Sequence, residues 1–260
     1  MGFYAISTTS LSNPYCDDKA KKIFYADDGS GGGKLADLRN WWDDLKINGP
    51  LFGYYPEATK TWLVTKPMYE DKARQMFPDV NVTVEGRKFL GSFIGSKEAT
   101  SDFISSKIEE WEKDIIALAK IAEYEPQLAY SAYVYGTSRR WQFVCRTTPG
   151  ISESMKHLEN LIRNKLMPTI MGGREINDEL RLILNMPARM GGMGFLNPSE
   201  EADHEYQNSI AATAKLTDAI YNQHPQFTVN EEEQVKIVDD IRKRKDQRWK
   251  DPKKQLLNAT

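Results

Sequence analysis

The stretch Lys21-Lys22-Ile23-Phe24-Tyr25-Ala26-Asp27-Asp28-Gly29 carries the sharpest structural signal in this chain. A short apolar and aromatic run lies between two lysines and two aspartates, which is typical of a strand that runs into a tight turn. Glycines follow at positions 29 and 31–33, and such a run is expected to interrupt any regular element. The stretch therefore predicts a strand, a turn and a flexible glycine segment.

On the C-terminal side of this stretch, apolar residues recur every three or four positions from Lys34, which predicts a helix that ends at Asn48-Gly49-Pro50. A strand is expected at 61–64, a short helix at 69–77 and a hairpin at 80–94. After Ser96 strand signals largely stop, and helices are expected at 103–122, 126–143, 155–168, 178–184, 198–221 and 231–249. The fold class is therefore α+β, with short antiparallel strands and helices in residues 1–96 and an all-helical region in 97–260.

Composition excludes several classes of protein. The 260 residues have a net charge of -2, so the whole chain has no general attraction to nucleic acid or acidic membranes. Two cysteines are too few for a disulfide framework, and three histidines follow no zinc-ligand spacing. No apolar run approaches 18 residues and no signal peptide is recognisable, so we expect no membrane partner. We expect an intracellular location, cytoplasmic or nuclear, and no secretion.

Asp27 and Asp28 are the first candidates for chemistry. Hard carboxylate oxygens suit Mg²⁺, and two such ions can clamp the reacting oxygens of a phosphoryl transfer. Adjacent aspartates alone mean little, because the chain has three further Asp-Asp pairs, at 17–18, 43–44 and 239–240. The aromatic strand before Asp27 and the glycine after Asp28 distinguish this pair, although an ordinary acidic turn stays an alternative.

Two other features bear on phosphate chemistry. The run at 29–35 is not a phosphate-binding loop, because Asp stands at position 28 and Leu at position 35 where the motif needs Gly and Ser or Thr. Lys60 precedes the predicted strand at 61–64. Near a polyphosphate such a lysine could neutralise or protonate a leaving group, and otherwise it is an ordinary surface charge.

The order of these motifs resembles the second half of a reverse transcriptase palm, of the retrotransposon type. It consists of YxDD at 25–28, a helix, the run Gly53-Tyr54-Tyr55-Pro56-Glu57-Ala58-Thr59-Lys60-Thr61-Trp62, and a hairpin ending in Phe89-Leu90-Gly91. The segment at 186–194 is also similar to one that follows the polymerase core in such elements.

The resemblance implies an RNA-directed DNA polymerase that uses Mg²⁺ or Mn²⁺, a primer–template duplex of RNA or DNA, and deoxynucleoside triphosphates. Asp27 would be a metal ligand and Asp28 its acidic neighbour in the same metal site. Tyr25 would lie by the primer end, and Lys60 near the phosphates of the incoming nucleotide. The hairpin that grips the primer would be formed by Arg87, Lys88, Phe89, Leu90 and Gly91. Residues 97–260 would form the thumb and connection.

The chain also departs from the family pattern. A strand with a further catalytic aspartate normally precedes YxDD, but only 24 residues precede Tyr25, and Asp17 and Asp18 lie in a polar stretch instead. We therefore expect the chain to be inactive alone and to need an upstream polymerase portion as a partner, so whether it is an enzyme is open. The unpaired edge of the strand around Ile23 would invite aggregation or a partner.

The alternative function is a non-catalytic module, derived from a reverse transcriptase, that binds nucleic acid or another protein. Candidate phosphate contacts include the basic end of the last helix, 242–250. Further candidates are Arg139, Arg140, Arg163 and Lys165, for each of which an ordinary surface charge is the competing interpretation. A solvated helix face is the competing interpretation of the last helix, because such charge runs also complement the helix dipole.

Overall fold

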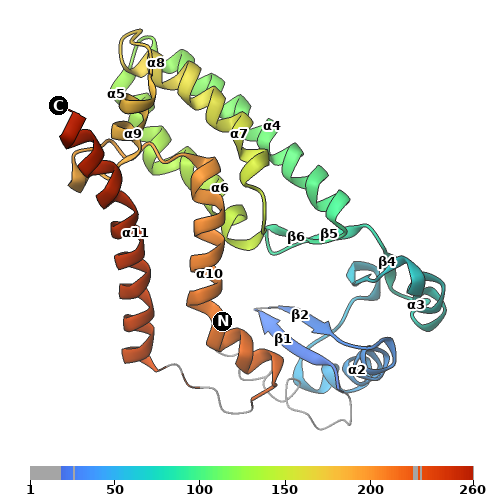
Figure 1. Cartoon of the computed structure of the whole chain (residues 1–260). Coiled ribbons are helices and arrows are strands. Elements are labelled where there is room, and N and C mark those ends of the chain that lie inside the picture. The colour runs from blue at the N-terminus through green and yellow to red at the C-terminus, as the bar shows by residue number, and fades with distance from the viewer. Residues whose placement is uncertain (1–18, 26, 225–227, 229, 260) are drawn as a thin grey trace. The chain divides into compact units, whose positions relative to one another are not determined.

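The computed structural model describes residues 19–25, 27–224, 228 and 230–259, with side chains as far as residue 250. The fold is mixed, with helices and short strands in small sheets (Figure 1). The chain divides into two compact units. Unit 1 comprises the described parts of Met1–Arg87, Ile94–Ser96 and Thr213–Val229, and unit 2 comprises those of Lys88–Phe93, Lys97–Ala212 and Asn230–Thr260. The sequence predicted a boundary near residue 96, but residues 88–93 belong to unit 2, and the described part of 213–229 belongs to unit 1.

Unit 1 begins with two antiparallel strands, β1 (Lys21–Tyr25) and β2 (Asp28–Gly32), followed by helix α2 (Leu35–Asn48). Pro50 lies in the short helix η1 (Gly49–Phe52), which ends α2 as the sequence predicted. The remaining elements are η2 (Ala58–Lys60), β3 (Trp62–Val64), η3 (Pro67–Tyr69), α3 (Glu70–Met76) and β4 (Asn81–Thr83). Strands β5 (Gly86–Phe89) and β6 (Ser92–Gly95) follow.

The core of unit 1 is the apolar face of α2. Leu38, Trp41, Trp42 and Leu45 are buried at the three- and four-residue spacing seen in the sequence. Each such side chain contributes about 1.5–3 kcal/mol when it leaves water. Asp79 fixes the loop before β4 to the helix, because it accepts hydrogen bonds from the Trp42 indole and the Lys46 ammonium.

The strand pairing corrects the predicted hairpin at 80–94. Strand β4 pairs in parallel with β3, and the hairpin is formed instead by β5 and β6. Helix α3 lies between β3 and β4 and supplies the crossover that parallel strands require. Leu90 and Gly91 have φ of 46° and 85°, which gives the tight two-residue turn of an antiparallel hairpin between β5 and β6.

The glycine segment after Asp28 is a regular strand, not the break that the sequence suggested. Its Gly31 lies against Trp41 so closely that a Cβ atom there would overlap the indole ring. Phe24 of β1 meets the same indole and Tyr54 edge-on, with ring centroids 6.5 and 5.7 Å apart. Strand β2 therefore needs glycine in order to lie over the aromatic side chains of unit 1.

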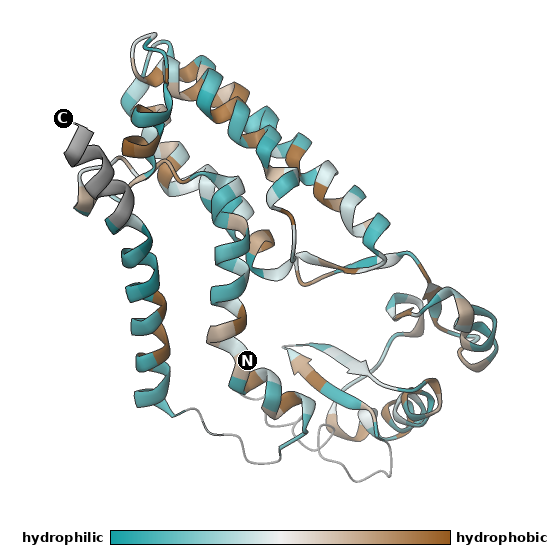
Figure 2. Ribbon diagram, in the orientation of Figure 1, coloured by the Kyte–Doolittle hydropathy of each residue, from teal (hydrophilic) through white to brown (hydrophobic). Residues whose placement is uncertain are grey.

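Unit 2 is helical apart from its part of the β5–β6 hairpin. Helix α4 shows hydrophobic and hydrophilic residues along its length (Figure 2), with the predicted apolar stripe buried. The helical elements are α4 (Lys97–Ala122), α5 (Pro126–Ala132), η4 (Tyr133–Thr137), α6 (Ser138–Thr147), α7 (Ser152–Leu161), η5 (Ile162–Leu166), α8 (Met167–Ile170), α9 (Asp178–Asn185), η6 (Ala188–Met190), α10 (Pro198–Tyr221) and α11 (Glu231–Ala259). The last residues of α10 belong to unit 1.

Two π-helical turns change the predicted helices. The turn η4 separates α5 from α6 within the helix expected at 126–143. The turn η5 leads into α8, so the helix expected to end near Pro168 continues to Ile170. Pro168 lies in the first turn of α8, where its missing N–H is not needed.

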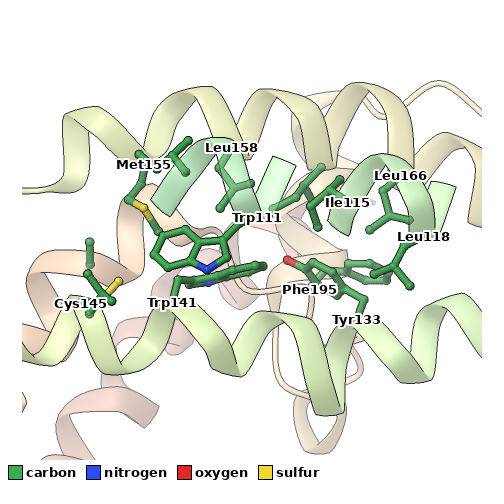
Figure 3. Close-up of a cluster of buried hydrophobic side chains, with 14 of the residues drawn as sticks. Trp111, Ile115, Leu118, Tyr133, Trp141, Cys145, Met155, Leu158, Leu166 and Phe195 are labelled. Atoms are coloured by element: carbon green, nitrogen blue, oxygen red, sulfur yellow. The ribbon is translucent and has the colours of Figure 1, made fainter. Parts of the chain in front are cut away.

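The core of unit 2 joins α4, α6 and α7 (Figure 3). Trp111 of α4 and Trp141 of α6 have ring centroids 5.9 Å apart. Tyr133 stacks on Phe195 at 4.9 Å and is fully buried, which raises the pKa of its phenol well above the usual range. These aromatic side chains belong to one continuous hydrophobic core in unit 2.

Candidate functional site

The YxDD residues form the tip of the β1–β2 hairpin. Tyr25 pairs with Asp28 across the turn, and Asp27 lies in the turn itself; Ala26 is outside the described residues. Both aspartates are exposed, and Tyr25 is 65% exposed. The hairpin thus presents a phenol and two carboxylates to solvent.

Asp27 and Asp28 differ from the other described aspartate pairs in their ion pairing. Asp43 forms ion pairs with Arg39 and Lys46, and Arg39 lowers the pKa of that carboxyl through its hydrogen bonds. In the pair at 239–240, the aspartates form ion pairs with Arg242 and Lys243. Within the described part of the chain, no lysine or arginine pairs with Asp27 or Asp28. The pair at 17–18 lies outside the described residues.

The two hairpin carboxylates fit the chemistry of a hard divalent cation, but they do not complete a site. Mg²⁺ is commonly bound through one or two carboxylates together with water and substrate phosphates. Among the described residues there is no group of three or more His, Cys, Asp or Glu side chains that could hold a metal ion. Asp27 and Asp28 can therefore supply part of a ligand set, and further oxygens must come from elsewhere.

Lys60 ends η2 and is held by its own loop. Its ammonium lies 2.7 Å from the Glu57 carboxylate, and its side chain is 79% exposed. The hydrogen bond with Glu57 raises the pKa of Lys60 and, in return, lowers that of Glu57. The structure therefore pairs Lys60 with Glu57, and the described ion pairs do not link it to the hairpin aspartates.

The five residues 87–91 form the end of β5 and its turn. The Arg87 guanidinium lies over the Trp62 ring, 4.0 Å from its centroid, so the structure brings together two of the sequence motifs. Lys88 lies 5.8 Å from the Phe103 ring centroid, which is a second cation–π contact. Phe89 is partly buried, while Leu90 and Gly91 form the exposed turn.

Two basic residues near the end of α11 pair with acidic residues of α10. Lys245 lies 2.5 Å from Glu205, and Arg248 forms an ion pair with Glu201. Burial raises the pKa of Glu201 despite Arg248, whereas for Glu205 the effect of burial is outweighed by Lys245 and Arg146, which hold its pKa low. No local sequence pattern predicts these ion pairs, because the acidic residues precede the basic ones by 40 positions or more.

The three arginines among the other candidate phosphate contacts also have partners, whereas Lys165 is exposed. Arg140 pairs with Glu110 and Asp114, and Arg163 donates to Asp178 and to the Ile176 carbonyl. Arg139 donates to Gln142 at 3.1 Å. These contacts favour structural roles for the three arginines.

The segment at 186–194 is built into unit 2 and is not a free loop. Gly194 N–H donates to the Met186 carbonyl and Phe195 N–H to that of Leu184. A Cβ atom at Gly192 would overlap the Met186 carbonyl oxygen, so only glycine fits there. The segment therefore packs against the end of α9, and these contacts indicate a structural role.

No protein-family model matches this chain, and no curated protein or solved structure matches it at a significant level. Among the described helices, none is both long enough and apolar enough to cross a membrane.

Proposed function

We propose that this chain is part of an RNA-directed DNA polymerase of the reverse transcriptase type, and that it contributes the YxDD hairpin of the palm. The observation that carries the proposal is the Asp27-Asp28 pair at the tip of a tight antiparallel hairpin, without a basic partner among the described residues. Un-neutralised carboxylates at a turn are suited to bind a cation, whereas paired ones are not. The ordered motifs of the sequence supply the rest of the argument.

The resemblance to reverse transcriptases supplies the proposed roles of individual residues. Asp27 and Asp28 would hold Mg²⁺ or Mn²⁺, which would supply charge stabilisation for nucleotidyl transfer when bound. Tyr25, opposite Asp28, would contact the primer end. Arg87 and its stacked Trp62 would position the primer strand, and Lys60 would have to leave Glu57 in order to meet nucleotide phosphates.

The 260-residue chain is proposed to be inactive by itself. Two carboxylates leave the ligand set of two metal ions incomplete, and the described residues offer no cluster of three. An upstream polymerase portion would supply the missing aspartate. Primer extension by the purified chain in Mg²⁺ or Mn²⁺, abolished by Asp27→Ala, would contradict this part of the proposal.

Metal binding tests the hairpin directly. Free Mn²⁺ can be measured by electron paramagnetic resonance during titration of the chain with and without a deoxynucleoside triphosphate. We expect Asp27→Asn to weaken Mn²⁺ binding and the matched Asp240→Asn to leave it unchanged, because Asp240 is paired with Lys243. Equal Mn²⁺ affinity in the two variants would remove the basis for a metal site at the hairpin.

The alternative, a nucleic-acid-binding module, has less support from the contacts. Its candidate basic residues on α11 are largely paired with acids of the same unit. Duplex binding that falls steeply with salt would favour the module, because phosphate contacts release counterions. If Arg87→Ala abolished this duplex binding, the binding surface would be the β5–β6 hairpin and not α11.

A further inference from the structure

Strand β1 has a second edge that faces away from β2. In an antiparallel hairpin with a two-residue turn, the two residues that flank the turn exchange main-chain hydrogen bonds with each other. Every second residue pair along the hairpin is hydrogen-bonded in the same way. Tyr25, Ile23 and Lys21 therefore direct their main-chain groups toward β2, while Lys22 and Phe24 direct theirs outward. Among the described residues, β2 is the only strand that pairs with β1.

The side chain of Gln223 covers the outward edge of β1 at Lys22. The Lys22 N–H donates to Gln223 Oε1 at 3.2 Å, and Gln223 Nε2 donates back to the Lys22 carbonyl at 3.1 Å. The carboxamide of Gln223 thus presents the same acceptor and donor that the peptide group of a neighbouring strand would present. The Lys21 ammonium lies 5.3 Å from the Tyr221 ring centroid and holds the same segment.

Gln223 lies in an unfavourable backbone conformation. Its φ is 50°, in the left-handed region, which few residues other than glycine adopt readily. Its N–H donates to the Ile220 carbonyl and the His224 N–H to that of Ala219, which is the helix-ending pattern that usually places glycine at this position. A glutamine here costs backbone energy, and its side-chain bonds to Lys22 offset that cost.

We propose that the outward edge of β1 is a self-association surface covered by Gln223, and that its occupant when uncovered is β1 of a second copy of this chain. The charges of the strand support this choice. Basic Lys21 stands at its start and acidic Asp27 and Asp28 follow its end. Antiparallel pairing about a twofold axis places each basic end beside the acidic end of the other copy.

The register of the pair follows from the outward residues. Lys22 would exchange main-chain hydrogen bonds with Phe24 of the second copy, and the two Ile23 residues would lie opposite each other. Ile23 and Tyr25 are 40% and 65% exposed and lie on one face of β1, so pairing gives them apolar contacts that they lack. Parallel pairing would instead bring the like charges of the two copies together.

The experiment measures the dimer dissociation constant of the full chain by sedimentation velocity. Gln223→Gly suits the left-handed backbone and removes the cover, so we expect the dimer to tighten by at least about ten-fold. Gln223→Glu keeps the size of the side chain but cannot donate to the Lys22 carbonyl, so it should tighten the dimer also. Gln207→Ala, at an exposed position of α10, is the matched control and should change nothing.

Charge reversal distinguishes this pairing from general aggregation. In the Gln223→Gly background, Lys21→Glu should weaken the dimer, and adding Asp27→Lys should restore it. Circular dichroism identifies any variant that fails to fold. A dissociation constant unchanged in both Gln223 variants overturns the proposal, as does a dimer that the charge reversals leave intact.

Discussion

The replacement Arg181→Leu should destabilise unit 2 more than any surface change. The Arg181 guanidinium donates to both carboxylate oxygens of Glu159, at 2.6 and 2.7 Å, and to the Phe195 carbonyl at 2.8 Å. The side chains of Arg181 and Glu159 are 7% and 11% exposed. Removing one partner of such a buried pair costs about 3–5 kcal/mol, and the unpaired Phe195 carbonyl places the loss toward the upper end.

The loss of stability in Arg181→Leu should depend on pH, in a direction set by the pKa of Glu159. Burial already raises the pKa of Glu159, and Arg181 opposes this shift. Without Arg181 the pKa of Glu159 in the folded variant rises further. In the unfolded chain the pKa of Glu159 is near 4.5, so above this pH the folded variant holds a proton that the unfolded chain has lost. The stability of the variant therefore falls as pH rises above about 4.5, and its deficit is largest at neutral pH.

Urea unfolding followed by tryptophan fluorescence and circular dichroism measures both effects, since Trp111 and Trp141 lie in the same core. The double replacement Glu159→Leu with Arg181→Leu should recover much of the loss, because no buried charge remains unpaired. Arg140→Leu, which removes the surface ion pairs with Glu110 and Asp114, should cost only about 1 kcal/mol. A deficit of that small size in Arg181→Leu, or one independent of pH, would refute the reasoning.

Three further predictions concern packing and reactivity. Gly192→Ala should lower the free energy of unfolding by about 1–3 kcal/mol or more through overlap with the Met186 carbonyl, while Gly32→Ala, with open space around it, should cost much less in the same urea assay. Gly31→Ala should shift the fluorescence of Trp41, since β2 must move off the indole; an unchanged spectrum would contradict the close approach. Burial raises the pKa of the Cys145 thiol to about 12, so iodoacetamide at pH 8 should modify it slowly in the folded chain and rapidly in urea, as mapped by mass spectrometry.

The amphipathic helices could be predicted because their signal is local. The stripe from Phe103 to Ala122 and that of Leu38 to Leu45 repeat with the helical period, and both are buried as expected. The pairing of β3 with β4 could not be predicted, because it depends on the path of α3 between them. Strand β2 has no apolar pattern at all, and its place is set by the indole of Trp41.

The sequence supplies the candidate residues of the site, but only part of their electrostatic surroundings. The sequence singles out Asp27 and Asp28 by their neighbours, whereas the ion-pair partners that distinguish them from other aspartate pairs are only partly visible in it. Ion pairs of Asp43 are local, at three and four positions, and could have been found. The pairing of Lys245 with Glu205 joins two helices and could not. Nor does any sequence pattern place Gln223 beside Lys22, 201 positions away.

Strand β1 carries both proposals, and its geometry allows them to be separated. The proposed metal ligands stand at the turn, whereas the covered edge lies at Lys22, three pairs before it. Gln223→Gly therefore changes the edge and leaves both carboxylates in place, so Mn²⁺ binding by the monomer should not change. Asp27→Asn removes one ligand and one of the two acidic charges near the turn, so it should weaken Mn²⁺ binding strongly and the Gln223→Gly dimer only slightly. A strong change of both Mn²⁺ binding and dimer affinity in either variant would contradict both proposals, because it would mean that the hairpin unfolds as a whole.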